Sequence, residues 1–173
     1  MRVTKTNIVG EVNRGWQVAV TTLMFERANI GMGFQLEPVM HQLIDLSKRI
    51  SYNGTPAWED EAVRQRLMQL LIEVHALKYN GYRQLTRQLR GVPPGPEGSL
   101  AKLSGSELTV RIAQFAMELL GPYSQLALGS PYALDSGKWS RRALASRLMT
   151  IAGGTSEIQR GIIGDRVLGL PKG

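Results

Sequence analysis

The chain has 173 residues, of which 43% are hydrophobic, and carries a formal net charge of +7. This length and apolar content fit one globular domain with a sizeable core, and no run approaches the roughly 18 apolar residues of a membrane-spanning helix. The sequence contains no cysteine, which excludes disulfides and thiolate metal sites, and its two histidines give little support to any other metal centre. The N-terminal segment lacks the apolar centre of a secretory signal, so we expect a cytoplasmic protein without membrane insertion.

The positive charge is not concentrated in one segment. Basic residues occur in short pieces such as KRI, RQR and RQLR, and aromatic residues make up only 6% of the chain. Nucleic-acid binding normally uses a basic patch on one face, so we expect no nucleic-acid partner. The charge can instead attract an anionic small molecule or a more acidic domain or subunit, or it can lie on solvated helix faces.

The first two helical stretches follow an irregular lead. An apolar segment from about Trp16 to Ile50 predicts the first, in which Gly31 and Gly33 indicate close packing against another helix. The second is expected from about Trp58 to Leu89, because acidic residues open it, arginines close it and the segment GVPPGPEG forbids its continuation. Its apolar stripe consists of Ala62, Val63, Leu67, Leu70, Leu71, Val74 and Leu77.

Three further helices are expected in the second half of the chain. One runs from about Ser99 to Leu120, and a shorter one near Trp139 to Ile151 follows an irregular link at 121–137. Ser156 and Gln159 are spaced as a capping box at the start of the last helix. Since no alternating strand pattern of useful length occurs, the sequence predicts an all-α fold, an antiparallel four-helix-type bundle with a short C-terminal helix.

One charged pair interrupts the apolar first stretch. Between Trp16 and Leu36 the only charged residues are Glu26 and Arg27. A carboxylate among apolar residues must be paired, hydrogen-bonded or neutralised. The pair can be a structural ion pair with another helix or a pair at the solvent edge. Alternatively, burial can raise the pKa of a carboxylate and make it a proton acceptor.

A glycine pair precedes the last predicted helix. Gly153 and Gly154 can simply turn the chain between two helices. They also let a ligand approach the backbone closely, and the start of the next helix offers unsatisfied N–H groups that favour anions and polarised carbonyls. The spacing of the residues does not decide between these interpretations.

Three segments carry a resemblance to a known family. The stretch IAGGTSEIQRGIIGDRVLGLP resembles the C-terminal signature of flavin-dependent acyl-CoA dehydrogenases, and TNIVGEVNRGWQVAVTTLMFERANIG resembles the same family where its β domain passes into the C-terminal helical domain. The region GPEGSLAKLSGSEL is similar to the bacterial members. The resemblance implies that residues 1–15 are a remnant of the preceding β domain or a linker, and that residues 16–173 are the C-terminal helical domain.

The resemblance also implies a reaction and a base. The family removes the α-proton of an acyl-CoA thioester with a carboxylate while a hydride passes from the β-carbon to the flavin. Many members carry this base immediately before the GT of the signature, which is the position of Gly153 here. In the branch with isovaleryl- and long-chain-type enzymes the base lies on the first helix, at the position that matches Glu26. Glu26 is therefore expected to be the base.

The resemblance assigns the substrate contacts as well. Met24 and Phe25 are expected to line the acyl pocket, and Arg27 to hold either the helix or the end of the substrate. The backbone N–H of Gly153 or Gly154 is expected to hold the thioester oxygen and stabilise the charge that grows as the proton leaves.

The expected cofactor is FAD, for which this chain supplies only part of a site. Thr155, Ser156 and Glu157 match the family segment that touches flavin. The arginine and phenylalanine that usually contact flavin after the first helix fall near Arg49, which is shifted, and Asn53, which replaces the phenylalanine. A glutamine that usually reaches a neighbouring subunit's flavin is absent near ELLGPYS.

The resemblance finally implies partners. Besides the acyl-CoA substrate, the chain is expected to need the family's N-terminal and β domains or a partner subunit, and to be inactive alone. It is expected to form a homo- or hetero-oligomer. The alternative to a catalytic domain is a non-catalytic helical subunit that completes the flavin site of a hetero-oligomeric dehydrogenase.

Overall fold

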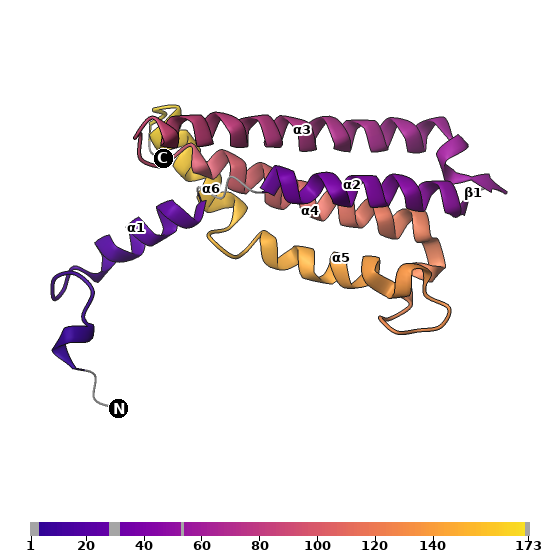
Figure 1. Ribbon diagram of the computed structural model, residues 1–173, viewed down its shortest axis with the longest axis horizontal. Coiled ribbons are helices and arrows are strands. Elements are labelled where there is room, and N and C mark those ends of the chain that lie inside the picture. Colours follow the sequence, from indigo (N-terminus) through magenta and orange to yellow (C-terminus); the bar gives the residue numbers. More distant parts are fainter. Residues whose placement is uncertain (1–3, 28–31, 53, 172–173) are drawn as a thin grey trace.

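The computed structural model describes residues 4–27, 32–52 and 54–171, without the side chains of Arg27 and Met32. Four helices lie side by side and alternate in direction (Figure 1), which confirms the predicted all-α bundle. These helices are α2 (Met32–Arg49), α3 (Glu61–Leu89), α4 (Gly98–Leu120) and α5 (Lys138–Met149). The other elements are α1 (Gly15–Arg27), α6 (Ser156–Ile162), the π-helix Ile163–Val167, the strands β1 (Ser51–Tyr52) and β2 (Thr55–Pro56), and the short 3-10 helices Lys5–Asn7, Ala57–Glu59, Gly121–Gln125 and Leu134–Gly137.

The N-terminal half differs from the prediction in two respects. The expected first stretch, Trp16 to Ile50, contains two helices, and α1 projects away from the bundle that α2 helps to form (Figure 1). The strands β1 and β2 pair as a small antiparallel hairpin between α2 and α3. Two residues per strand are too few to produce an alternating pattern in a sequence. Gly31 lies outside the described residues.

The boundaries of α3 and α4 have local causes. The side chain of Asp60 accepts a hydrogen bond from the backbone N–H of Val63 at 3.0 Å and so caps the start of α3. Beyond the end of α3, Gly91 has a φ of +76°, which favours glycine, and prolines follow. Arg87 and Glu97 form a 2.6 Å ion pair across this link and hold the two helices as an antiparallel pair.

The core fills the space between the four long helices. Trp139, on α5, is completely buried and is the largest side chain there. The predicted stripe of α3 is buried at five of its seven positions, whereas Ala62 is exposed and Leu71 is half-buried. Outside this stripe, the fully or almost fully buried members of the core are Met40, Leu43, Leu46, Ala57, Leu108, Ile112 and Ala116.

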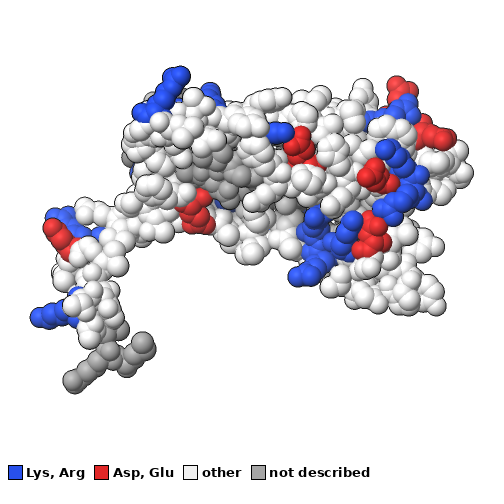
Figure 2. Space-filling view, viewed as in Figure 1, with Lys and Arg blue, Asp and Glu red and all other residues white. Residues whose placement is uncertain are grey.

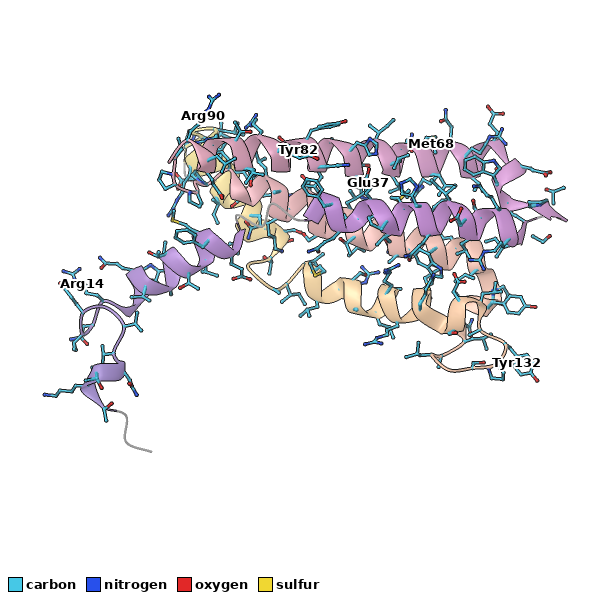
Figure 3. The ribbon with its side chains drawn as sticks, viewed as in Figure 1. Arg14, Glu37, Met68, Tyr82, Arg90 and Tyr132 are labelled. Carbon is cyan, nitrogen blue, oxygen red and sulfur yellow. The ribbon has the colours of Figure 1, made fainter. Side chains whose placement is uncertain are left out.

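The backbones of α2 and α3 approach each other closely at Gly33. A Cβ at this residue would lie 2.5 Å from the backbone nitrogen of Lys78 and 2.6 Å from its Cα, so only glycine fits. One turn further along α2 lies Glu37, which is labelled in Figure 3. It accepts a 2.7 Å hydrogen bond from Nζ of Lys78. Phe34 meets Tyr82 edge to face with ring centroids 5.0 Å apart. The predicted close packing at Gly33 is confirmed.

We expect Gly33→Ala to lower the free energy of unfolding, because the new methyl group would push against backbone atoms that cannot rotate away. Overpacking of this kind typically costs about 1–3 kcal/mol. Urea denaturation followed by circular dichroism would measure it. Gly161→Ala is the matched control, since no atom lies within 4 Å of the added Cβ in α6 and alanine favours a helix. Equal stability of the two variants would contradict the close approach.

Charged side chains are spread over the surface. On the face shown in Figure 2, lysines and arginines form separate groups, several of which adjoin acidic residues. Within the described part of the chain, no helix has the length and apolarity needed to cross a membrane.

Candidate active site at the glycine turn

Three elements meet at the turn between α5 and α6. Glu26 lies on the last turn of α1, and its Oε1 is 3.1 Å from the point where a Cβ on Gly153 would be. Cε of Lys102, near the start of α4, lies 3.7 Å from the same point. The fold therefore brings together the two positions at which the resemblance places a base, although they are far apart in the sequence.

The glycine pair adopts backbone conformations that suit glycine. Gly153 has a φ of +71° and Gly154 a φ of +108°, values that other residues rarely adopt. The N–H of Gly154 donates to the carbonyl of Ile151 at 3.1 Å. From the other side, Nε2 of Gln159 donates to the carbonyls of Gly153 at 2.9 Å and Gly154 at 3.4 Å. Both glycines serve as a turn, and the turn also lies beside a carboxylate.

The start of α6 differs from the predicted capping box. Thr155, not Ser156, is the N-cap, and its side chain accepts from the N–H of Ile158 at 3.5 Å. Gln159 does not reach back to the cap as expected, because its amide binds the glycine carbonyls. Hydrogen bonds from its own backbone N–H and from Thr155 hold the pKa of Glu157 below its ordinary value. A carboxylate at this position stays ionised and complements the helix dipole.

The candidate substrate residues lie on the last turn of α1, at the end that meets the glycine turn. Glu26 is exposed, so the interpretation as a buried carboxylate is wrong for this chain. Phe25 is also exposed, at 64% of its surface, while Met24 is half-buried. The side chain of Arg27 lies outside the described residues. Since α1 projects from the bundle, its apolar surface offers a face against which further protein or an acyl chain can pack.

Two of the predicted flavin contacts border a surface hollow. Ser156 and Glu157 line it together with Thr150 and residues of α4, among them Val110. Charged residues that line the hollow form ion pairs. Arg160 pairs with Glu107 at 2.6 Å, and Arg111 pairs with Glu73. The hollow is open to solvent and combines hydroxyl, apolar and charged groups.

Arg49 does not lie near the other predicted flavin contacts. It ends α2 next to β1, at the opposite end of the bundle from α6 (Figure 1). Its Nη2 donates to both carboxylate oxygens of Asp135 at 3.0 Å. This hydrogen bond is the main cause that raises the pKa of Arg49 and lowers that of Asp135. The structure does not bring Arg49 together with Thr155, Ser156 and Glu157.

Two residues at the turn were missed as site candidates. Lys102 is buried and donates from Nζ to the carbonyl of Met149 at 2.9 Å, at the end of α5. Gln159 is completely buried. Lys102 could have been found from the sequence, because its charge interrupts the apolar start of α4. The spacing of Gln159 from Ser156 fits a capping box, so the sequence alone does not indicate its contact with the turn.

The fold is an all-α bundle in which α1, α4 and the α5–α6 turn meet at a glycine pair. Residues 13–168 match the family model described as "Acyl-CoA dehydrogenase, C-terminal domain". The chain is 31% identical to acyl-CoA dehydrogenase FadE26 of Mycobacterium tuberculosis over 99% of its own length and 44% of the relative's. It is 34% identical to acyl-CoA dehydrogenase IpdE1 of Mycolicibacterium smegmatis over 95% of its own length and 39% of that protein's. The chain belongs to the acyl-CoA dehydrogenase family, whose members depend on FAD.

Solved structures agree with this assignment. A chain of the ChsE4-ChsE5 complex from Mycobacterium tuberculosis superimposes with a TM-score of 0.80 at 30% identity, over 99% of this chain and 45% of that one. Butyryl-CoA dehydrogenase from Megasphaera elsdenii shares the fold with a TM-score of 0.73 at 22% identity. The chain spans less than half the length of each of these relatives, so it corresponds to one domain of the family's fold.

Proposed function

We propose that this chain is the catalytic helical domain of an acyl-CoA dehydrogenase and that Glu26 is the base. The observation that carries the proposal is the 3.1 Å approach of the Glu26 carboxylate to the Cβ position of Gly153. A carboxylate on α1 thus occupies the space that a side chain from the α5–α6 turn would enter. No carboxylate is available at residue 153 itself.

In the proposed reaction, Glu26 removes the α-proton of the acyl thioester. The electron pair of that C–H bond forms the new double bond as the β-hydrogen leaves with its own pair. When bound, FAD supplies the acceptor for this hydride. The proton remains on Glu26 until it is released to solvent.

The glycine turn holds the thioester oxygen in this proposal. We assign the donor role to the N–H of Gly153, because this residue is the one that Glu26 approaches. A backbone donor placed where negative charge develops typically contributes about 3 kcal/mol of transition-state stabilisation. Met24 and Phe25 lie two residues and one residue before the base, respectively, and would face the acyl chain. Arg27 would orient either α1 or the end of the substrate.

The proposed flavin contacts lie at the two ends of the bundle. Thr155, Ser156 and Glu157 at the start of α6 would touch the flavin beside the thioester. Arg49, at the other end of the bundle, would meet a flavin only in another subunit, and we propose that the chain works in a homo- or hetero-oligomer. The rest of the flavin and acyl-CoA site would come from the family's N-terminal and β domains.

A second candidate role is that of a helical subunit which completes another chain's flavin site. The similarity to a chain of a two-protein complex favours it. In this role Glu26 would be dispensable, and the partner would supply the base. Both roles place the chain in an oxidoreductase that acts on acyl-CoA.

Reconstitution tests the proposal. The chain alone is expected to be helical but free of stoichiometric flavin, because its described residues form one side of the site. Joined to the missing domains, or mixed with its partner subunit, it is expected to hold FAD that bleaches when an acyl-CoA is added without oxygen. Absorbance spectra measure both properties. A reconstituted protein whose flavin no acyl-CoA reduces would contradict the assignment.

A further inference from the structure

The turn between α5 and α6 has no side chain of its own to fix it at Gly153 and Gly154. Glycine populates many backbone conformations, so hydrogen bonds must select one. The peptide that joins the two glycines is held at both polar ends. Its carbonyl accepts from Nε2 of Gln159 at 2.9 Å, and its N–H donates to Ile151 at 3.1 Å.

Gln159 holds the next peptide as well. The same Nε2 lies 3.4 Å from the carbonyl oxygen of Gly154. The position of Gln159 is itself fixed, because its backbone N–H donates to the carbonyl of Thr155 at 2.9 Å in the first turn of α6. One side-chain amide therefore sets the direction of two successive peptide groups.

The side-chain amide of Gln159 is a neutral donor, so it fixes the glycine carbonyls without adding charge to the turn. Burial also shields the bonds from competing water, since Gln159 has no exposed surface.

The oxygen of the Gln159 side-chain amide argues against a role in stability alone. Oε1 of Gln159 is buried and has no hydrogen-bond partner within the described part of the chain. A buried acceptor without a partner costs free energy. An apolar side chain of similar size would avoid that cost but would lose the donor to the turn.

We propose that Gln159 is a positioning residue for dehydrogenation, which sets the Gly153–Gly154 turn at the distance and angle from Glu26 that the thioester needs. It acts through the turn and does not touch the substrate. This inference rests on the proposed function.

The test compares Gln159→Leu with the parent in the flavin-loaded enzyme that contains this chain. Leucine has a similar volume and no donor. Flavin reduction by acyl-CoA is expected to slow by about 10²-fold, as for a misplacement of roughly 1 Å, while the dissociation constant of acyl-CoA changes by less than about threefold. The carbonyl stretching band of a bound, ¹³C-labelled acyl-CoA is expected to shift towards its frequency in water, because the thioester oxygen loses its aligned donor.

Gln159→Glu provides a second variant if leucine prevents folding. A protonated carboxyl group can donate to the glycine carbonyls as the amide does, whereas the ionised group repels them. The rate of this variant relative to the parent is therefore expected to rise as the pH falls. The amide of Gly154 in either variant is expected to exchange with deuterium faster than in the parent, a measurement that needs no flavin.

Ser47→Ala is the control for general loss of a buried hydrogen bond. Ser47 is completely buried in α2 and donates to the carbonyl of Ile44 at 2.6 Å, away from the turn. An unchanged rate and carbonyl band in Gln159→Leu, or an equal effect of Ser47→Ala on both, would overturn the inference. If Glu26→Gln slows the reaction and Gln159→Leu does not, only the positioning role fails. If Glu26→Gln keeps the full rate, the proposed function fails first.

Discussion

Glu26→Gln is expected to slow reduction of the flavin by acyl-CoA by at least about 10²-fold, the usual effect of losing a general base. Glutamine keeps the size and much of the hydrogen bonding of glutamate but cannot accept the α-proton. Binding of acyl-CoA should change little, because the proton is transferred only in the transition state. Stopped-flow absorbance of the flavin measures the rate, and a titration without turnover measures the affinity.

Glu61→Gln is the matched control for this variant. Glu61 is also an exposed glutamate on a helix, but it begins α3 near the β1–β2 hairpin, at the other end of the bundle. Its substitution should leave the rate unchanged. If Glu26→Gln reduces its flavin as fast as the parent, Glu26 is structural and the role of a non-catalytic subunit gains support.

The second large effect is expected from Trp139→Ala. Trp139 is completely buried against the core, and its Nε1 donates to Asp135 at 3.1 Å. Removing a buried aromatic side chain typically costs about 3–5 kcal/mol of unfolding free energy. Arg142 stacks over the indole with its guanidinium carbon 5.3 Å from the ring centroid, so the loss also removes a cation–π contact.

Trp16→Ala is the control for this variant, because it removes a tryptophan that is not buried. Trp16 lies on α1 with 78% of its surface exposed in this chain, and its removal should change the unfolding free energy by less than about 0.5 kcal/mol. Urea titrations of the two variants against the parent provide the measurement. A loss at Trp16 as large as that at Trp139 would mean that α1 packs far more tightly than its exposure indicates.

The long helices were predictable because their signals are local. Asp60, Gly91 and the prolines that follow mark the end points of α3 within a few residues of the predicted ones. That α1 and α2 are two helices was not predictable, since the apolar pattern runs continuously from Trp16 to Ile50. The hairpin β1–β2 was not predictable, because strands of two residues are too short to give an alternating pattern.

Some residues of the candidate site could be predicted from the sequence and others could not, for a physical reason. Family resemblance named Glu26 and Gly153, but only the fold shows that they lie side by side. The role of Gln159 depends on the direction of its side chain, and a spacing of three residues from Ser156 fits a capping box equally well. The exposure of Glu26 could not be read from its apolar neighbours, because those neighbours lie on a helix that leaves the bundle.

The approach of Glu26 to Gly153 bears on how such enzymes can change over evolution. A carboxylate from either segment would reach the same place, so the base could move from one segment to the other without any change in the position of the substrate. A side chain at residue 153 would, however, need the turn to change, because Gly153 has a φ of +71° and its Cβ position lies 3.1 Å from Oε1 of Glu26. A glycine at 153 and a carboxylate on α1 would therefore have to change together.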